Sequence, residues 1–174
     1  KRIVAVCEKN VTRPARELCG VGGFSVANYA IWHDDATSFD AFAAFVERRV
    51  PIIAPGADPV SAQARITSAS LFTILGARPH LGRFFRAAED QPGGSNEIVL
   101  SYPFWQQQFG GDAPIVGKRM LVNANDYTIV GVTAPSFGVY GPVDVWLPIP
   151  LGPAARARAG RSLRTLALLK PGVA

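Results

Sequence analysis

Two histidines and the acids beside them are the side chains of this 174-residue chain best suited to bind a metal. His33 is followed directly by Asp34 and Asp35, while His80 stands far along the chain. A catalytic zinc needs three rigidly held protein ligands, and these residues lack the spacing that would place two histidines on one helical face. The pattern favours a polar helix end at the surface, and we expect neither a metal nor another cofactor.

Ser25 stands in the run "GFSVA", which matches half of the nucleophile elbow of serine hydrolases. The elbow needs a second glycine, which is missing here, and a strand directly before the serine. The overlapping run "GVGGFS", from Gly20, lacks the third glycine of a dinucleotide-binding loop and follows a long loop. Ser25 is better explained as the N-cap of a helix that begins at Val26.

Glu89, Asp90 and Glu97 are acids without a partner group of matching role, so paired-carboxylate catalysis is not indicated. The phosphate-binding motif G-x-x-x-x-G-K-[ST] does not occur in the sequence, so ATP hydrolysis must belong to a separate domain or chain. Catalysis would require the two histidines, or Ser25 and one histidine, to converge in space. We therefore expect no catalytic residue and no enzyme.

The composition is that of a globular protein, with 48% hydrophobic and 18% charged residues. This length suits one domain or two small lobes. The net charge is +5, and four arginines crowd a segment rich in Ala, Gly and Pro: Arg156, Arg158, Arg161 and Arg164. Aromatic residues are not interleaved with them as in surfaces that stack nucleic acid, so we expect a solvated loop and no nucleic-acid partner.

The chain has two cysteines, Cys7 and Cys19. In an oxidising compartment they could close a short disulfide-bonded loop, whereas in a reducing compartment they would be thiols. Cys7 could also be a buried strand residue, because free cysteines are often buried.

Helix and strand patterns alternate irregularly, which predicts an α+β fold whose sheet is at least partly antiparallel. Ser38 is expected to cap a second helix, in which Phe39, Phe42, Ala43 and Val46 would form an apolar stripe. Further helical segments are expected at 71–75, 102–109 and 113–116, the second capped by Ser101 and ended by Gly110. Strands are expected at 2–6, 48–54, 61–70, 96–101, 118–123, 126–132, 144–149 and 164–169.

Four of these strands carry a more detailed expectation. In 61–70, Ala62 and Ala64 alternate with Gln63 and Arg65, which is typical of a half-buried strand. Strands 118–123 and 126–132 should form a hairpin around Ala124–Asn125. Strand 144–149 is bounded by prolines, which favours a place at the sheet edge.

A series of segments, taken together, resembles a known family. They are "SVANYAIWHDDATSFDAFAAF", "ITSASLFTILGARPHLGRFFRAAED", "IVLSYPFWQQQFGGDAPIVGKRMLVNANDYTIVGV" and "DVWLPI". In this order they resemble the MacB-like periplasmic core domain of ABC transporter permeases, in particular the duplicated-permease branch found in acidobacteria. The resemblance runs from about Arg2 to Val173.

The resemblance implies a split porter lobe of βαβ type, formed by residues 1–69 and 149–174, with a smaller α+β lobe, 70–148, inserted between its parts. It also implies transmembrane helices on both sides of the domain and a cytoplasmic ATPase as partners. The chain would stand on the periplasmic side of the inner membrane and pass conformational change to a substrate or a periplasmic protein. Both ends look cut, and a last porter helix should follow "LKPGVA".

The stretch 75–90, "LGARPHLGRFFRAAED", could be an anion-binding loop or a corner between packed layers. The resemblance favours a corner that serves as a hinge into the inserted lobe, with Gly76, Pro79 and Gly82 as the hinge residues. An alternative from another class remains open: a periplasmic module that binds a ligand or a peptide, or serves adhesion, in a cleft between the lobes.

Overall fold

The computed structural model describes residues 3–8, 23–90, 96–138, 140–152 and 160–173, and it confirms the α+β class. The helices are α1 (Val26–Asp35), α2 (Ser70–Ile74) and α3 (Tyr102–Phe109), with 3₁₀ turns η2 (Ala87–Asp90) and η3 (Ala113–Ile115). The strands are β1 (Ile3–Ala5), β2 (Phe24–Ser25), β3 (Phe39–Ile53), β4 (Val60–Thr67), β5 (Pro79–Gly82), β6 (Glu97–Leu100), β7 (Arg119–Val122), β8 (Asn125–Thr133), β9 (Val145–Pro148) and β10 (Arg161–Leu169).

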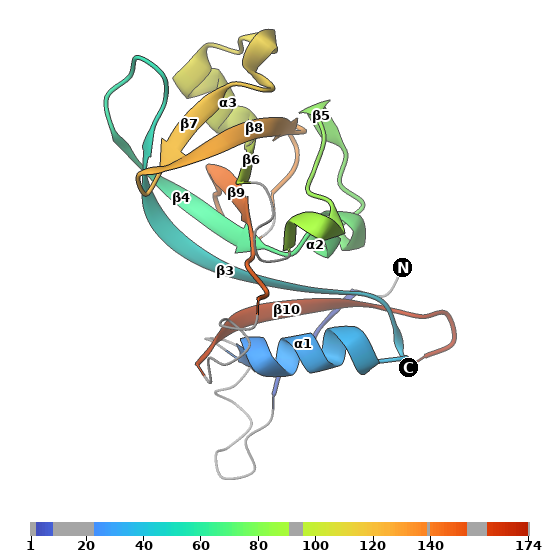
Figure 1. Cartoon of the computed structure of the whole chain (residues 1–174). Helices are drawn as coiled ribbons and strands as arrows, with labels where there is room; N and C mark the ends of the chain where they lie inside the picture. The colour runs from blue at the N-terminus through green and yellow to red at the C-terminus, as the bar shows by residue number, and fades with distance from the viewer. Residues whose placement is uncertain (1–2, 9–22, 91–95, 139, 153–159, 174) are drawn as a thin grey trace.

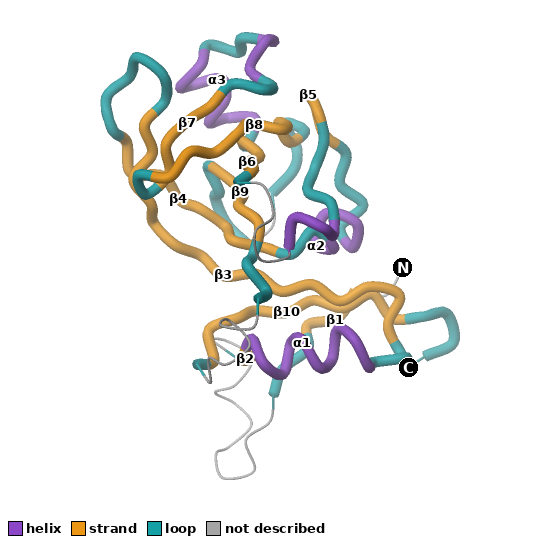
Figure 2. The backbone as a smooth tube through the Cα atoms, in the orientation of Figure 1, coloured by secondary structure: helices purple, strands orange, loops and turns teal. Residues whose placement is uncertain are grey.

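Within these residues the strands form one mixed sheet in the order β1-β10-β3-β4-β9-β6-β8-β5, with β2 beside β10 and β7 beside β3 and β8. Figure 1 shows α1 lying under β10 and the first part of β3, where β1 and β2 also pair with β10, while α2, α3 and strands β4 to β9 lie on the other side of β3 or toward its far end. Figure 2 shows the same division along the backbone, with β3 as the strand common to both parts.

Three apolar clusters hold this arrangement together. One lies between α1 and the sheet and includes Phe24, Tyr29 and Phe42. The second covers the other face of the same strands, where α2 packs on Phe45 and Trp146. The third fills the space among β3, β4, β6, β8 and α3. Because β3 and β10 have apolar clusters on both faces, the sheet is buried there on two sides.

The helix expected at 39–46 is wrong, because these residues begin the long strand β3. Phe42, Ala43, Ala44 and Phe45 are all buried, since α1 covers one face of the strand and α2 covers the other. A strand buried on both faces reads as a continuous apolar run, and such a run contains helical spacings by chance.

The edge position expected for strand 144–149 is also wrong. β9 lies inside the sheet, parallel to β4 and antiparallel to β6. Pro148 is tolerated because it is the last residue of the strand, and Ile149 supplies the next N–H, which donates to Thr67 O at 3.0 Å. The predicted hairpin is present, but its turn is one residue earlier: Val122 pairs with Asn125.

The capping signals of Ser25 and Ser101 are confirmed, whereas Ser38 caps no helix because β3 follows it. Ser25 Oγ accepts from Asn28 N at 3.1 Å at the start of α1, and Ser101 Oγ accepts from Phe104 N at 3.3 Å at the start of α3. Gly110 ends α3 in the left-handed conformation, at φ 59°. In the described part of the chain, no helix has the length and apolar character needed to cross a bilayer.

Candidate functional site

The structure keeps the two histidines apart. His33 lies on α1, with Nδ1 3.1 Å from Asp34 Oδ1, whereas His80 lies on β5, with its ring against those of Tyr102 and Trp105. Figure 1 places α1 and β5 at opposite ends of the molecule. Among the described residues, no three His, Cys, Asp or Glu side chains gather where they could hold a metal ion.

The acids of the 75–97 region neutralise an arginine of the same region. Arg83 Nη2 donates to both carboxylate oxygens of Glu97 at 2.7 Å, and Arg83 Nη1 donates to Glu89 Oε2 at 3.2 Å. Asp90 is 7% exposed and accepts from Ala69 N with both oxygens, at 3.2 and 2.9 Å. Burial raises the pKa of Asp90 to about 6, although the Ala69 hydrogen bonds lower it in part.

A row of side chains across β3, β4 and β9 forms the most unusual polar feature of the sheet. Arg65 pairs with Glu47 on one side and with Trp146 on the other. Its side chain is 1% exposed, and its guanidinium carbon lies 5.2 Å from the ring centroids of both Phe45 and Trp146. Nη2 donates to Glu47 Oε1 at 2.5 Å and to Tyr140 O at 3.0 Å. The guanidinium is thus held by aromatic faces, a carboxylate and a carbonyl.

The same row holds Tyr140 over the sheet. The carbonyl of Tyr140 accepts from Arg65, and its ring stacks on that of Phe45 with centroids 5.6 Å apart. The backbone of Tyr140 has φ 57°, a left-handed conformation that costs free energy for a residue with a side chain. Even so, 53% of Tyr140 is exposed, which leaves much of the residue open to contact with another molecule.

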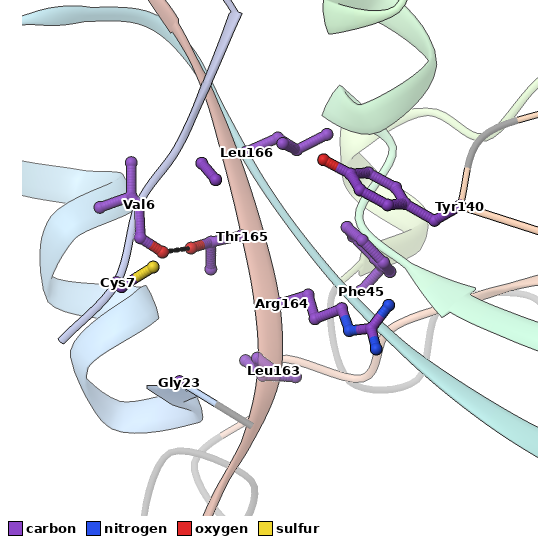
Figure 3. A pocket seen from close by; sticks show the side chains of 10 residues that line it. Val6, Cys7, Gly23, Phe45, Tyr140, Leu163, Arg164, Thr165 and Leu166 are labelled. Atoms are coloured by element: carbon purple, nitrogen blue, oxygen red, sulfur yellow. Dashed lines mark hydrogen bonds between the residues drawn. The ribbon is translucent and has the colours of Figure 1, made fainter. Parts of the chain in front are cut away.

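A hollow of about 200 Å³ lies between Tyr140, β10 and the end of β1. β1 and β2 both pair with β10, β1 from Leu166 onward and β2 up to Leu163, so Arg164 belongs to neither ladder. Figure 3 shows Phe45, Arg164, Leu166 and Tyr140 on one side of β10, while Val6, Cys7 and Thr165 lie on the other. The Thr165 hydroxyl donates to the carbonyl of Val6, which ties the end of β1 to β10.

The charges beside the hollow are unbalanced. Arg164 is 43% exposed, and its Nη1 lies 3.9 Å from Glu47 Oε1, the oxygen that already accepts from Arg65. One carboxylate therefore faces two guanidinium groups. Burial lowers the pKa of Arg65, Glu47 raises it, and the positive charge of Arg164 lowers it again.

A second hollow, of about 380 Å³, has polar walls from β3, β4 and the segment before β9. Of the described residues that line the two hollows, Tyr140 is the only one they share. In the second hollow, Asp144 Oδ2 accepts from Gln63 N at 2.7 Å, which fixes the wall formed by β4.

The residues of this site differ from those that sequence patterns indicated. The alternation in 61–70 predicts that Arg65 faces solvent, yet Arg65 is buried because Phe45 and Trp146 cover it from β3 and β9. Tyr140 carries no signal in the sequence that would have revealed it. The opposite charges of Glu47, directly before the predicted strand 48–54, and Arg65, within the predicted strand 61–70, were the available hint.

Several sequence-based expectations remain predictions. Cys7 lines the first hollow, while Cys19, Gly20, Arg156 and Arg158 lie outside the described residues, so the disulfide stays a prediction. The hinge role of Gly76, Pro79 and Gly82 also stays a prediction. Gly76 and Gly82 have φ of 62° and 64°, and Pro79 begins β5, which pairs with β8.

Comparison with known proteins gives a family match over most of the chain. The model of the MacB-like periplasmic core domain matches residues 11–174. No curated protein matches the chain.

Two solved structures share the fold. The periplasmic region of MacB from Actinobacillus actinomycetemcomitans is 12% identical with a TM-score of 0.69, and the match covers 99% of this chain and 76% of that one. The extracellular domain of the noncanonic ABC-type transporter YknZ from Gram-positive bacteria is 11% identical with a TM-score of 0.64, covering 86% of this chain and 74% of that one.

Proposed function

Because this chain belongs to the family of MacB-like periplasmic core domains, we propose that it acts as a non-catalytic mechanical relay of an ABC transporter permease. It would stand on the periplasmic side of the inner membrane and pass movements of the permease's membrane helices to a periplasmic substrate or protein. A cytoplasmic ATPase would supply the energy. Residues 1–69 and 149–174 would form the porter lobe, and 70–148 the inserted lobe.

The single observation that carries this proposal is the continuity of β3. The strand pairs with β10 from Phe39 to Phe45 and with β4 from Phe45 to Ile52, so Phe45 belongs to both ladders. Its 15 residues span at most about 50 Å, at 3.3–3.4 Å per residue. A strand paired along its whole length resists bending between its two halves, as a relay requires.

Buried hydrogen bonds support the junction between the two parts. Tyr29 OH donates to Phe42 O at 3.1 Å from α1, and Ser70 Oγ donates to the same carbonyl at 2.8 Å from α2. Ala44 N donates to Ser68 Oγ at 3.1 Å. Elements on both faces of β3 are therefore fixed to its backbone, and burial raises the pKa of Tyr29 to about 12, which keeps this donor protonated.

The non-catalytic part of the proposal is supported by the structural use of reactive side chains. Ser25 caps α1, and Glu89 and Glu97 bind Arg83. A relay needs rigid parts and a contact surface, and these groups contribute to the rigidity.

Fluorescence energy transfer in the assembled transporter tests the relay. One dye pair joins Asp35, at the end of α1, to Asp58, in the exposed loop after β3, through encoded non-natural residues that leave the cysteines unchanged. A second measurement uses a dye at Asp58 and acceptor lipids in a nanodisc. On adding ATP we expect constant transfer within the domain and changed transfer to the lipids.

Two results would refute the relay. If ATP changed the energy transfer between positions 35 and 58, the domain would be a flexible clamp and not a rigid relay. Constant transfer in both measurements, with ATP being hydrolysed, would describe a domain that takes no part in the movement.

A further inference from the structure

We propose that the hollow between Tyr140 and β10 is a docking site for an extended peptide segment of a partner protein. The segment would place one bulky apolar side chain in the hollow and the carboxylate of a neighbouring residue on Arg164. This inference does not depend on the relay role, and it gives the peptide-binding alternative a specific place on the molecule.

The walls and size of the hollow favour an apolar side chain. The rings of Phe45 and Tyr140 and the side chain of Leu166 line it on the face of β10 that carries Arg164 (Figure 3). Its volume of about 200 Å³ is below the roughly 300–1,000 Å³ of clefts that enclose a whole small-molecule ligand. A single aromatic or aliphatic side chain suits it better.

The charges favour an acid beside that side chain. Arg164 is 43% exposed and shares Glu47 with Arg65, which holds the same oxygen at the shorter distance of 2.5 Å. Counting only the residues that the structure describes, the guanidinium of Arg164 therefore retains uncompensated positive charge at the rim. A carboxylate of a partner would complement this charge, and the rest of the partner would keep the interaction partly shielded from water.

The arrangement of the two hollows favours an extended chain over a compact ligand. Tyr140 lines both hollows, and Glu47, Arg49 and Asp144 contribute polar groups to the second one. A strand-like segment alternates its side chains and spans several residues, so it can occupy an apolar hollow and continue past Tyr140 into a polar one. Exposed tyrosines held rigidly are frequent anchors at such interfaces.

Three short peptides with blocked ends test the proposal by titration of the ¹⁵N-labelled chain in NMR. They carry Phe-Asp, Phe-Asn or Ala-Asp at the centre of otherwise identical sequences. We expect the Phe-Asp peptide to bind most tightly, with a dissociation constant near the millimolar range, because the contact is only the size of a side chain. The shifted amide signals should include Tyr140 and Leu163–Leu166.

A matched pair of variants separates the specific contact from general charge. Arg164→Gln should weaken the Phe-Asp peptide about threefold and leave the Phe-Asn peptide unchanged, as for a partly exposed ion pair. Arg119→Gln removes the same charge at an exposed position of β7, away from the hollow, and should change neither.

Several results would overturn the proposal. They are equal binding of the three peptides, shifts confined to other regions, no binding at 10 mM peptide, or equal effects of the two variants. If free N-acetylphenylalanine bound as tightly as the Phe-Asp peptide, the hollow would be a small-molecule site, which also contradicts a docking site for an extended segment.

Discussion

Arg65 Nη2 donates to Glu47 Oε1 at 2.5 Å, directly across the antiparallel pairing of β4 with β3. The two partners have unequal access to water. The Arg65 side chain is 1% exposed and the Glu47 side chain is 32% exposed. A Glu47 that loses its partner can turn to solvent, whereas an Arg65 that loses its partner keeps its charge in a buried place. Removing Glu47 should therefore cost more free energy of unfolding than removing Arg65.

This asymmetry predicts a non-additive pair of substitutions. Glu47→Gln should lower the free energy of unfolding by about 2–3 kcal/mol, because it leaves a buried guanidinium without its acid. In a chain that already carries Arg65→Met, the same Glu47→Gln change should cost less than about 0.5 kcal/mol. Urea denaturation of the four chains measures both costs. Equal costs in the two backgrounds would show that the ion pair is not the source of the effect.

Asp90 predicts a pH dependence of stability. Its pKa is about 6 in the folded chain, raised by burial from an ordinary value of 3.8. The folded state therefore holds the proton to higher pH than the unfolded state. The contribution of protonated Asp90 to the free energy of unfolding is complete below pH 3.8, and it is lost as the pH rises through about 6.

Asp90→Asn should remove that pH dependence. At pH 7.5 the variant should be more stable than the natural chain by about 2–3 kcal/mol, because its neutral amide can accept from Ala69 N without burying a charge. At pH 4 the difference should be close to zero. Denaturation at a series of pH values checks this, with Asp40→Asn at an exposed position as control. A variant less stable than the natural chain at pH 7.5 would contradict the prediction.

Local signals in the sequence predicted what local geometry decides. Ser25 and Ser101 were recognised as caps because a cap depends on a few consecutive residues. β3 and the burial of Arg65 could not be predicted in this way. The groups that cover β3 come from α1 and α2, and the rings that enclose Arg65 come from Phe45 and Trp146, on two other strands. Such contacts depend on the order of strands in the sheet, and periodicity within one segment carries no information on that order.

The β7–β8 turn offers a stabilising substitution. Asn123 and Ala124 have φ of 49° and 62°, as in the two central positions of a type I′ turn. Asparagine tolerates this conformation, whereas alanine loses roughly 1–2 kcal/mol there. Ala124→Gly should therefore raise the free energy of unfolding by about 0.5–1 kcal/mol, after the greater freedom of glycine in the unfolded chain is counted. Thermal denaturation should show a smaller gain in stability for Asn123→Gly than for Ala124→Gly. A loss of stability in Ala124→Gly would refute this explanation.

A disulfide between Cys7 and Cys19 is expected when the protein is prepared from an oxidising compartment. Closing so short a loop should stabilise the chain by about 3 kcal/mol. Mass spectrometry of the chain, alkylated with and without prior reduction, should show labelling only after reduction. Complete labelling of both thiols without reductant would show that Cys7 and Cys19 are not disulfide-bonded.

Gly82 permits a test that separates close packing from hinge motion. A Cβ on Gly82 would lie 2.1 Å from Val130 O, whereas a Cβ on Gly56 would meet no atom within 4 Å. Both glycines have positive φ, 64° and 73°, so Gly56→Ala measures backbone strain alone. We expect a cost of about 1 kcal/mol for Gly56→Ala and more than about 3 kcal/mol for Gly82→Ala, because the latter also separates β5 from β8. Similar costs for the two substitutions would mean that β5 can move away from β8 with little loss of stability.

Hydrogen exchange extends the same test to the natural chain. Arg83 N–H donates to Val130 O at 2.9 Å, directly after Gly82. If Gly82 is a hinge that opens in the folded protein, this amide should exchange much faster than the central amides of β8, because opening would break its bond without global unfolding. If the glycine serves close packing, the amide should exchange as slowly as its neighbours in β8. We expect the Arg83 amide to exchange slowly in the isolated chain, because the Arg83 side chain also binds Glu97 on the adjacent segment. Fast exchange of this amide would contradict the close packing of Gly82 against β8.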